Sequence, residues 1–127
     1  MRTAVETNGA AAAIGPYSQA VRVGSLLFVS GQVALDPTTG KLVEGDIGVQ
    51  THRVLRSIRA ILEAAGVTFA DVARTTVYLV DLGDFHRMNE EYATYFTAPA
   101  PARSTIQVVG LPKGARVEID VVASLPA

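Results

Sequence analysis

Cysteine is absent from this sequence of 127 residues, which excludes disulfide bonds, a catalytic thiolate and cysteine-bound metal. Lysine is scarce, because Lys41 and Lys113 are the only two in the chain. Both lie in predicted turns rather than in an apolar core, which argues against Schiff-base chemistry. The two histidines, His52 and His86, are far apart in sequence and lie on polar faces of separate predicted helices. We therefore expect no metal site and no cofactor.

Long apolar runs are also missing. No segment approaches the roughly 20 apolar residues of a membrane span, and residues 1–14 lack the apolar core of a secretory signal, so we expect a cytoplasmic protein without a membrane partner. Charged residues make up only 18% of the chain and leave a net charge of −1. No broad basic field is present, which disfavours nucleic acid as a partner. A small domain with few charges exposes apolar surface, which favours subunit contacts.

Hydrophobic periodicity predicts a single α+β domain over residues 1–127. The apolar runs 21–23 and 26–30 are split by Gly24 and Ser25, which is typical of a hairpin, and the chain continues extended to residue 35. The clearest helix covers residues 46–65, with Asp46 as N-cap and Gly66 just beyond its end. The remaining predicted elements are strands over 71–80, 103–109 and 115–124 and a second helix over 84–96.

The resulting order, β-β-β-α-β-α-β-β, predicts one mixed sheet with both helices on the same face. Two helices cannot cover both sides of such a sheet. Its other face is bare in a monomer and must meet water or another subunit. This is a second reason to expect an oligomer.

The last two predicted strands carry the strongest chemical pattern. Arg103, Thr105 and Gln107 alternate along one strand, and Glu118 and Asp120 alternate along the next. If these strands are neighbours, the five side chains share one face of the sheet. An arginine can hold a carboxylate with two N–H groups, and a nearby carboxylate can activate water. A solvated polar face with incidental ion pairs fits the pattern better when the pattern is taken alone.

Three other residues are candidates for a binding site, each with an ordinary alternative. Tyr17 follows a rigid Gly-Pro pair and either lines a pocket or is a half-buried turn residue. Gly31 ends a strand, where it either lets a ligand approach the backbone or forms a β-bulge. Asn89 lies beside the apolar stripe of the second helix, or is simply exposed there. The serines lack the strand-turn-helix context of a nucleophile elbow, and no glycine-rich phosphate loop is present.

Eight short segments follow one another along the chain in a characteristic order. They are IGPYSQA from residue 14, VSGQ from 29, ILEAAG from 61, TTVYL from 75, DLGDF from 81, MNEEY from 88, PARST from 101 and LPKGARVEI from 111. Each match is short, but their order and spacing from residue 14 to about residue 123 resemble those of the RidA family of enamine/imine deaminases.

This resemblance implies a chorismate-mutase-like α+β fold and a homotrimer whose sheets form a central barrel, with the sites in clefts between subunits. It implies hydrolysis of 2-aminoacrylate and 2-iminobutanoate to 2-keto acids and ammonia without a cofactor. By position, Arg103 matches the arginine that binds the substrate carboxylate, and Glu118 the acid that positions or activates water. The positions that match the pocket are Tyr17, Ser30, Gly31, Asn89 and Thr105.

Two positions depart from the family pattern. Thr105 stands where many members have cysteine, which argues against a redox-switchable site but not against deamination, since a backbone group can serve there. Gln107 replaces a frequent glutamate and alters the charge around the site. Branches of the family without deaminase activity lack the arginine that Arg103 matches. Three alternatives stay open: a non-catalytic ligand-binding or chaperone module, a deaminase of another carboxylated imine, and a ribonuclease, which the net charge and the absence of a histidine pair disfavour.

Overall fold

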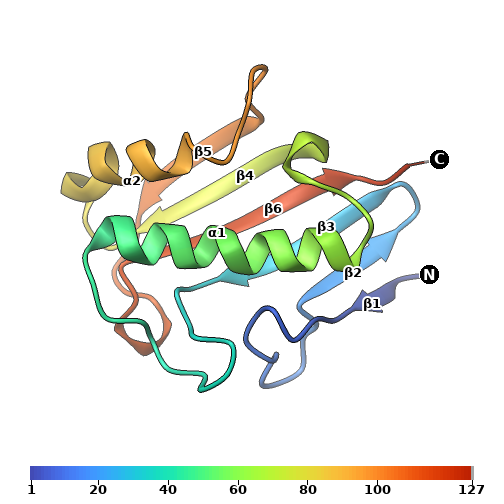
Figure 1. Cartoon of the computed structure of the whole chain (residues 1–127), viewed down its shortest axis with the longest axis horizontal. Coiled ribbons are helices and arrows are strands. Elements are labelled where there is room, and N and C mark those ends of the chain that lie inside the picture. Colours follow the sequence, from blue (N-terminus) through green and yellow to red (C-terminus); the bar gives the residue numbers. More distant parts are fainter. Residues whose placement is uncertain (127) are drawn as a thin grey trace.

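The computed structural model describes residues 1–126 and consists of one sheet and two helices (Figure 1). The six strands have the order β1-β2-β3-β6-β4-β5. Their bounds are β1 Thr3–Val5, β2 Ala20–Val23, β3 Leu26–Gln32, β4 Val72–Leu79, β5 Ala102–Gln107 and β6 Val117–Ser124, and the helices are α1 Ile47–Ala64 and α2 Phe85–Tyr92. Single 3-10 turns lie at η1 Phe69–Asp71, η2 Leu82–Asp84 and η3 Pro112–Gly114.

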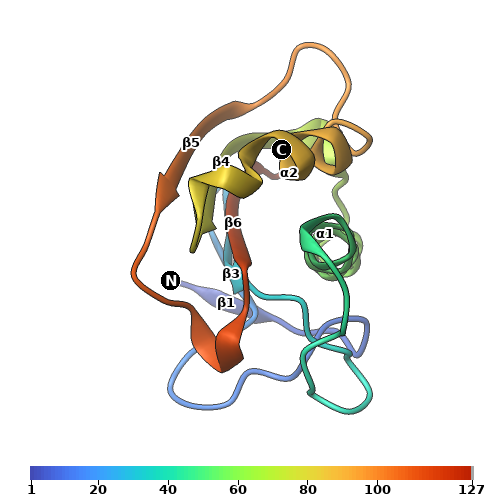
Figure 2. The same ribbon diagram turned by 90° about the vertical axis from the view of Figure 1, so that its left-hand side faces the viewer.

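Both helices cover the same face of the sheet, as the sequence predicts (Figure 2). Helix α1 packs an apolar stripe against the sheet that includes Leu55, Ile58 and Leu62, all fully buried. Burial of each such side chain contributes about 1.5–3 kcal/mol. The predicted helix ends are confirmed, because Asp46 Oδ1 accepts a 3.0 Å hydrogen bond from Val49 N and Gly66 has a φ of +81°.

The two strands with the chemical pattern are not neighbours. Strand β4 lies between them, paired parallel with β5 and antiparallel with β6. A parallel neighbour needs a long crossover, and the segment containing α2 supplies it between β4 and β5. The prediction of a single face shared by residues 103–107 and 118–120 depended on direct pairing of β5 with β6, and it is wrong.

Three further details differ from the sequence-based expectation. The chain begins with a short edge strand, β1, in which only Val5 is buried, so it has no periodic signal. Residues 33–35 do not continue the strand, because β3 ends at Gln32. Helix α2 ends at Tyr92 instead of reaching residue 96. From the hairpin of β2 and β3 onward the order of helices and strands is the predicted one, but the third N-terminal strand is β1, which was not predicted, and not the stretch 31–35.

The sheet face away from the helices is partly apolar. Val23, Leu26, Phe28 and Ile106 project from it and are each at least 40% exposed. They alternate with buried residues such as Leu27, which face α1. Within residues 1–126, no helix combines the length and apolar character needed to cross a membrane.

Candidate active site

Arg103 is held by one face of α2. Its Cζ atom lies 4.7 Å from the centre of the Tyr92 ring and 5.5 Å from that of Phe85. Its Nη1 donates a 2.7 Å hydrogen bond to Asn89 Oδ1. Phe85, Asn89 and Tyr92 are four and three residues apart, so they line the same side of the helix. Two ring contacts and one hydrogen bond therefore fix the plane of the guanidinium.

No carboxylate within residues 1–126 neutralises the charge of Arg103, which forms no ion pair there. Two positions further along β5, the Thr105 hydroxyl is buried and has no hydrogen-bond partner in the same part of the chain. A hollow of about 570 Å³ opens beside the guanidinium. Its walls are Asn89, Tyr92, Ala93, Phe96, Ala100, Pro101 and Arg103 itself.

Tyr92 is fixed by a second contact. Its hydroxyl oxygen lies 2.8 Å from Thr75 Oγ1, on β4. Burial raises the pKa of Tyr92, although the Thr75 hydrogen bond and the charge of Arg103 lower it in part. Tyr92 is therefore a neutral wall of the hollow beside Arg103.

Glu118 lies on the other face of the sheet. It is opposite Tyr78 in the β4–β6 register, and Tyr78 donates a 2.9 Å hydrogen bond to Asp120 Oδ2. Burial, and secondly the charge of Asp120, raise the pKa of Glu118. A carboxyl group with a raised pKa can accept or release a proton nearer neutral pH.

Gly31, in β3, leaves space for the side chain of Glu118. The register of β3 against β6 shifts between Val29 and Gln32, which is consistent with a β-bulge at this glycine. A Cβ atom at Gly31 would overlap the Glu118 carboxylate. The absence of a side chain at this position therefore lets Glu118 lie flat against the backbone of β3.

Ser30 links the Glu118 region to the loop that carries Tyr17. Its Oγ donates a 2.6 Å hydrogen bond to Ser18 O, and its backbone N donates to Gln19 O at 2.9 Å. Tyr17 is 54% exposed and accepts a 3.4 Å hydrogen bond from Ile14 N. Tyr17, Gly31 and Glu118 line one hollow of about 430 Å³.

Gln19 organises the same loop and was not recognised from the sequence. Its Oε1 accepts from Thr7 N at 2.7 Å, and its Nε2 donates to Thr7 O at 3.1 Å and Ala11 O at 2.9 Å. The side chain is buried. Nothing in the surrounding sequence marks this glutamine as an internal one, since its partners are backbone groups of a non-periodic segment.

The candidate residues therefore form two groups within one chain. Arg103, Asn89 and Thr105 lie together on the helix side, where Arg103 is opposite the buried Thr75. Tyr17, Ser30, Gly31 and Glu118 gather around the second hollow. Because side chains alternate along a strand and α2 contacts Arg103, the guanidinium and the Glu118 carboxylate face opposite sides of the sheet.

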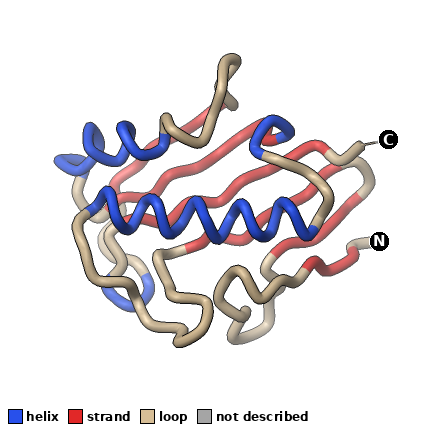
Figure 3. Tube along the Cα trace, in the orientation of Figure 1, coloured by secondary structure: helices blue, strands red, loops and turns tan. Residues whose placement is uncertain are grey.

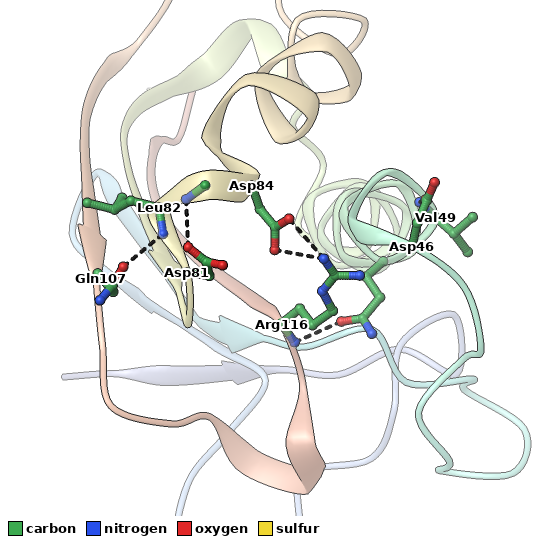
Figure 4. Close-up of polar contacts among 9 residues, drawn as sticks. Asp46, Val49, Asp81, Leu82, Asp84, Gln107 and Arg116 are labelled. Atoms are coloured by element: carbon green, nitrogen blue, oxygen red, sulfur yellow. Dashed lines mark hydrogen bonds and ion pairs between the residues drawn. The ribbon is translucent and has the colours of Figure 1, made fainter.

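Gln107 has a structural role at the start of α2. Its Oε1 accepts a 2.9 Å hydrogen bond from Leu82 N in η2 (Figure 4). Nearby, Arg116 Nη2 donates to both carboxylate oxygens of Asp84, at 2.8 and 2.9 Å. These contacts tie the segment before α2 to β5 and to the start of β6. They position the helix that holds Arg103.

The histidines lie away from both groups. His52 Nδ1 is 3.2 Å from Glu91 Oε1 and contacts the Tyr95 hydroxyl, so it joins α1 to the end of α2. His86 is exposed on α2. In the described part of the chain, no group of three His, Asp or Glu side chains is placed to hold a metal ion.

Comparison with known proteins identifies the family. The family model described as Endoribonuclease L-PSP matches residues 7–125. DfrA of Myxococcus xanthus is 51% identical over 124 residues, which cover 96% of this chain and 95% of DfrA. The 2-iminobutanoate/2-iminopropanoate deaminase of Mus musculus is 48% identical over 123 residues, which cover 97% of this chain and 91% of that protein. This chain belongs to the YjgF/RidA family.

Solved structures of the YjgF/RidA family share the fold. The crystal structure of the E. coli YjgF gene product is 40% identical with a TM-score of 0.91, covering 96% of this chain and 98% of the other. E. coli TdcF, solved with bound serine, is 39% identical with a TM-score of 0.92, covering 98% and 99%. The α+β architecture expected from the resemblance is thereby confirmed.

Proposed function

We propose that this chain hydrolyses 2-enamine and 2-imine acids, such as 2-aminoacrylate and 2-iminobutanoate, to 2-keto acids and ammonia. The observation that carries the proposal is the guanidinium of Arg103, which stacks against two rings, is tied to Asn89 and has no carboxylate partner among residues 1–126. A guanidinium fixed in this way is suited to bind a substrate carboxylate through two parallel N–H groups. The similarity to the mouse imine deaminase also supports it.

Glu118 is the proposed acid–base group. The carbon of a 2-imine is already electrophilic, so its hydrolysis needs an oriented water and a proton acceptor. The water oxygen bonds to that carbon while Glu118 takes a proton from the water and passes it to the imine nitrogen, which gives a neutral carbinolamine. The carbon–nitrogen bond of the resulting carbinolamine then breaks. Glu118 carries the hydroxyl proton to the nitrogen as this bond breaks, so ammonia leaves and the added oxygen becomes the keto oxygen.

The complete site is proposed to lie between two subunits of a homotrimer. Arg103 and Glu118 face opposite sides of one sheet, so a single chain does not present both to one small substrate. A second copy can bring its own Glu118 to the first copy's Arg103. Val23, Leu26, Phe28 and Ile106 on the face without helices support such packing, because exposed apolar side chains of this kind mark subunit contacts.

A coupled assay tests the reaction. A 2-imino acid is generated in situ, and the release of its keto acid is followed with and without the protein. We expect acceleration that survives treatment with EDTA. No acceleration with any carboxylated imine would contradict the proposal and favour a ligand-binding protein without turnover.

Mixed trimers test the shared site. Arg103→Ala and Glu118→Gln subunits are each expected to be inactive when pure. If one subunit supplies the arginine and the next the glutamate, every mixed trimer contains one intact pair among its three sites. In a 1:1 co-refolded mixture about three quarters of the trimers are mixed, so the mixture should recover about a quarter of the wild-type rate. Inactivity of the mixtures, with trimers seen by sedimentation equilibrium, would place both residues in one subunit's site.

A further inference from the structure

The hollow beside Glu118 is larger than a three- or four-carbon substrate requires. Its volume is about 430 Å³, whereas a cavity of about 150 Å³ holds a benzene ring. Tyr17, Gly31 and Glu118 are among the residues that line the hollow. A substrate positioned at the Glu118 carboxylate therefore has unfilled space next to it in the same chain.

The rest of the lining of this hollow is mainly apolar. It includes the side chains of Ile14, Val33, Leu35, Pro37 and Pro112. They come from two long loops, residues 6–19 and 33–46, and from η3, which lie along one edge of the molecule (Figure 3). An apolar wall gains free energy from an apolar ligand group in proportion to the area that is removed from water.

The second loop is held in place by its own contacts. Asp36 Oδ1 accepts hydrogen bonds from Thr38 N at 2.7 Å and Thr39 N at 3.2 Å, and Asp36 N donates to Lys41 O at 2.8 Å. Lys113 Nζ donates a 2.8 Å hydrogen bond to Gly40 O, which joins this loop to η3. The ammonium group of Lys113 is thus tied to the rim. The wall is preformed, as expected of a binding pocket.

We propose that this hollow receives the side chain of the substrate, and that the preferred substrates are 2-imino acids with branched or aromatic apolar side chains, such as those formed by oxidation of leucine or phenylalanine. The inference rests on the proposed function. Arg103 of a neighbouring copy holds the carboxylate and Glu118 faces the imine carbon with its water. The remaining substituent of that carbon then lies along the apolar wall.

The test compares two imines in the same assay. An L-amino-acid oxidase with catalase generates the imine of leucine or of alanine, and semicarbazide traps whatever the protein has not hydrolysed. We expect kcat/KM to be about tenfold higher for the leucine-derived imine, because each added methylene in an apolar pocket contributes a several-fold or larger effect. Equal or lower kcat/KM for this imine would overturn the inference.

Two variants test whether the hollow causes the preference. Val33→Phe narrows the hollow and should lower kcat/KM at least tenfold for the leucine-derived imine but less than about twofold for the alanine-derived one. Ile14→Asp places a charge on the wall, and because Ile14 is 81% exposed the substitution leaves the core intact. It should also lower kcat/KM for the leucine-derived imine much more than for the alanine-derived one. Val49→Phe, at an exposed position of α1 that does not line the hollow, is the matched control.

The outcomes separate the two proposals. If neither imine is hydrolysed, the proposed function fails, and the substrate preference fails with it. If both imines are hydrolysed and the variants affect them equally, the proposed function stands and the side-chain pocket is refuted. That result would be expected if a neighbouring subunit fills the hollow in the assembled protein.

Discussion

Asn89 and Arg103 are joined by a 2.7 Å hydrogen bond from Nη1 of the arginine to the side-chain oxygen of the asparagine. The bond connects α2 to β5 across fourteen positions of sequence. It fixes one end of the guanidinium, while the Tyr92 and Phe85 rings hold its plane. The orientation of the proposed carboxylate-binding group therefore depends on the position of α2.

Replacement of Arg103 should abolish most activity without unfolding the protein. Losing a two-pronged contact to a substrate carboxylate costs roughly 2–5 kcal/mol, which is about 30-fold to several thousand-fold in kcat/KM. Arg103→Lys should fail as Arg103→Ala does, because lysine keeps the charge but not the planar fork. Arg56→Ala, on the exposed face of α1, is the control. Arg103→Ala with more than half of the wild-type kcat/KM would place the carboxylate elsewhere.

Substitution of Asn89 should act on substrate binding through Arg103. Asn89→Ala removes a hydrogen bond to a charged group, which is worth about 1.5–3 kcal/mol, so KM should rise roughly tenfold or more. Asn89→Asp should raise KM further, because its carboxylate pairs with Arg103 and competes with the substrate. Steady-state kinetics at fixed ionic strength check this order. An Asn89→Asp enzyme with wild-type KM would show that Arg103 does not contact the substrate.

The sequence was sufficient to predict those helices and strands whose pattern involves residues close together in the chain. The 3.6-residue stripe through Leu55, Ile58 and Leu62 predicts α1, and Asp46 and Gly66 mark its ends correctly, because helix periodicity and capping involve residues close in sequence. The hairpin of β2 and β3 is likewise signalled by its own turn residues. The chemistry of Arg103 could be proposed from its residue type and the family resemblance.

The strand order could not be obtained in the same way. The position of β4 between β5 and β6 depends on the path of the crossover through α2. No pattern within residues 103–107 or 118–120 indicates that path. The opposite orientations of Arg103 and Glu118 follow from the order and were therefore missed. The same holds for Gln19, whose importance comes from backbone groups of a segment without periodicity.

Gln19 should contribute more to stability than an exposed glutamine. Gln19→Ala leaves the buried carbonyl of Ala10 and the part-buried backbone groups of Thr7 and Ala11 without their partner, at a cost of about 1–3 kcal/mol. Gln107→Ala, which loses one exposed hydrogen bond to Leu82 N, should cost about 1 kcal/mol or less. Urea unfolding at one protein concentration compares the two variants. Equal losses would mean that the loop of residues 7–19 does not depend on Gln19.

Glu118→Gln should separate activity from stability. Burial and the charge of Asp120 raise the pKa of Glu118 above its ordinary value of 4.5, so the folded chain holds this proton more tightly than the unfolded chain. Stability associated with Glu118 is therefore fully present below pH 4.5 and declines as the pH rises from there through the raised folded-state pKa. Glutamine stays uncharged, so the variant should be more stable than wild type at pH 7 and equally stable near pH 4.

The same variant should lose turnover, because glutamine cannot accept a proton from water. We expect kcat to fall about 100-fold to 10,000-fold, with little change in KM. Unfolding curves at pH 4 and pH 7, together with steady-state kinetics, provide both readouts, and Glu63→Gln on the exposed face of α1 is the control. If Glu118→Gln is destabilised equally at both pH values, the carboxyl group has a structural role that its raised pKa does not capture. If kcat is retained, another group must activate the water.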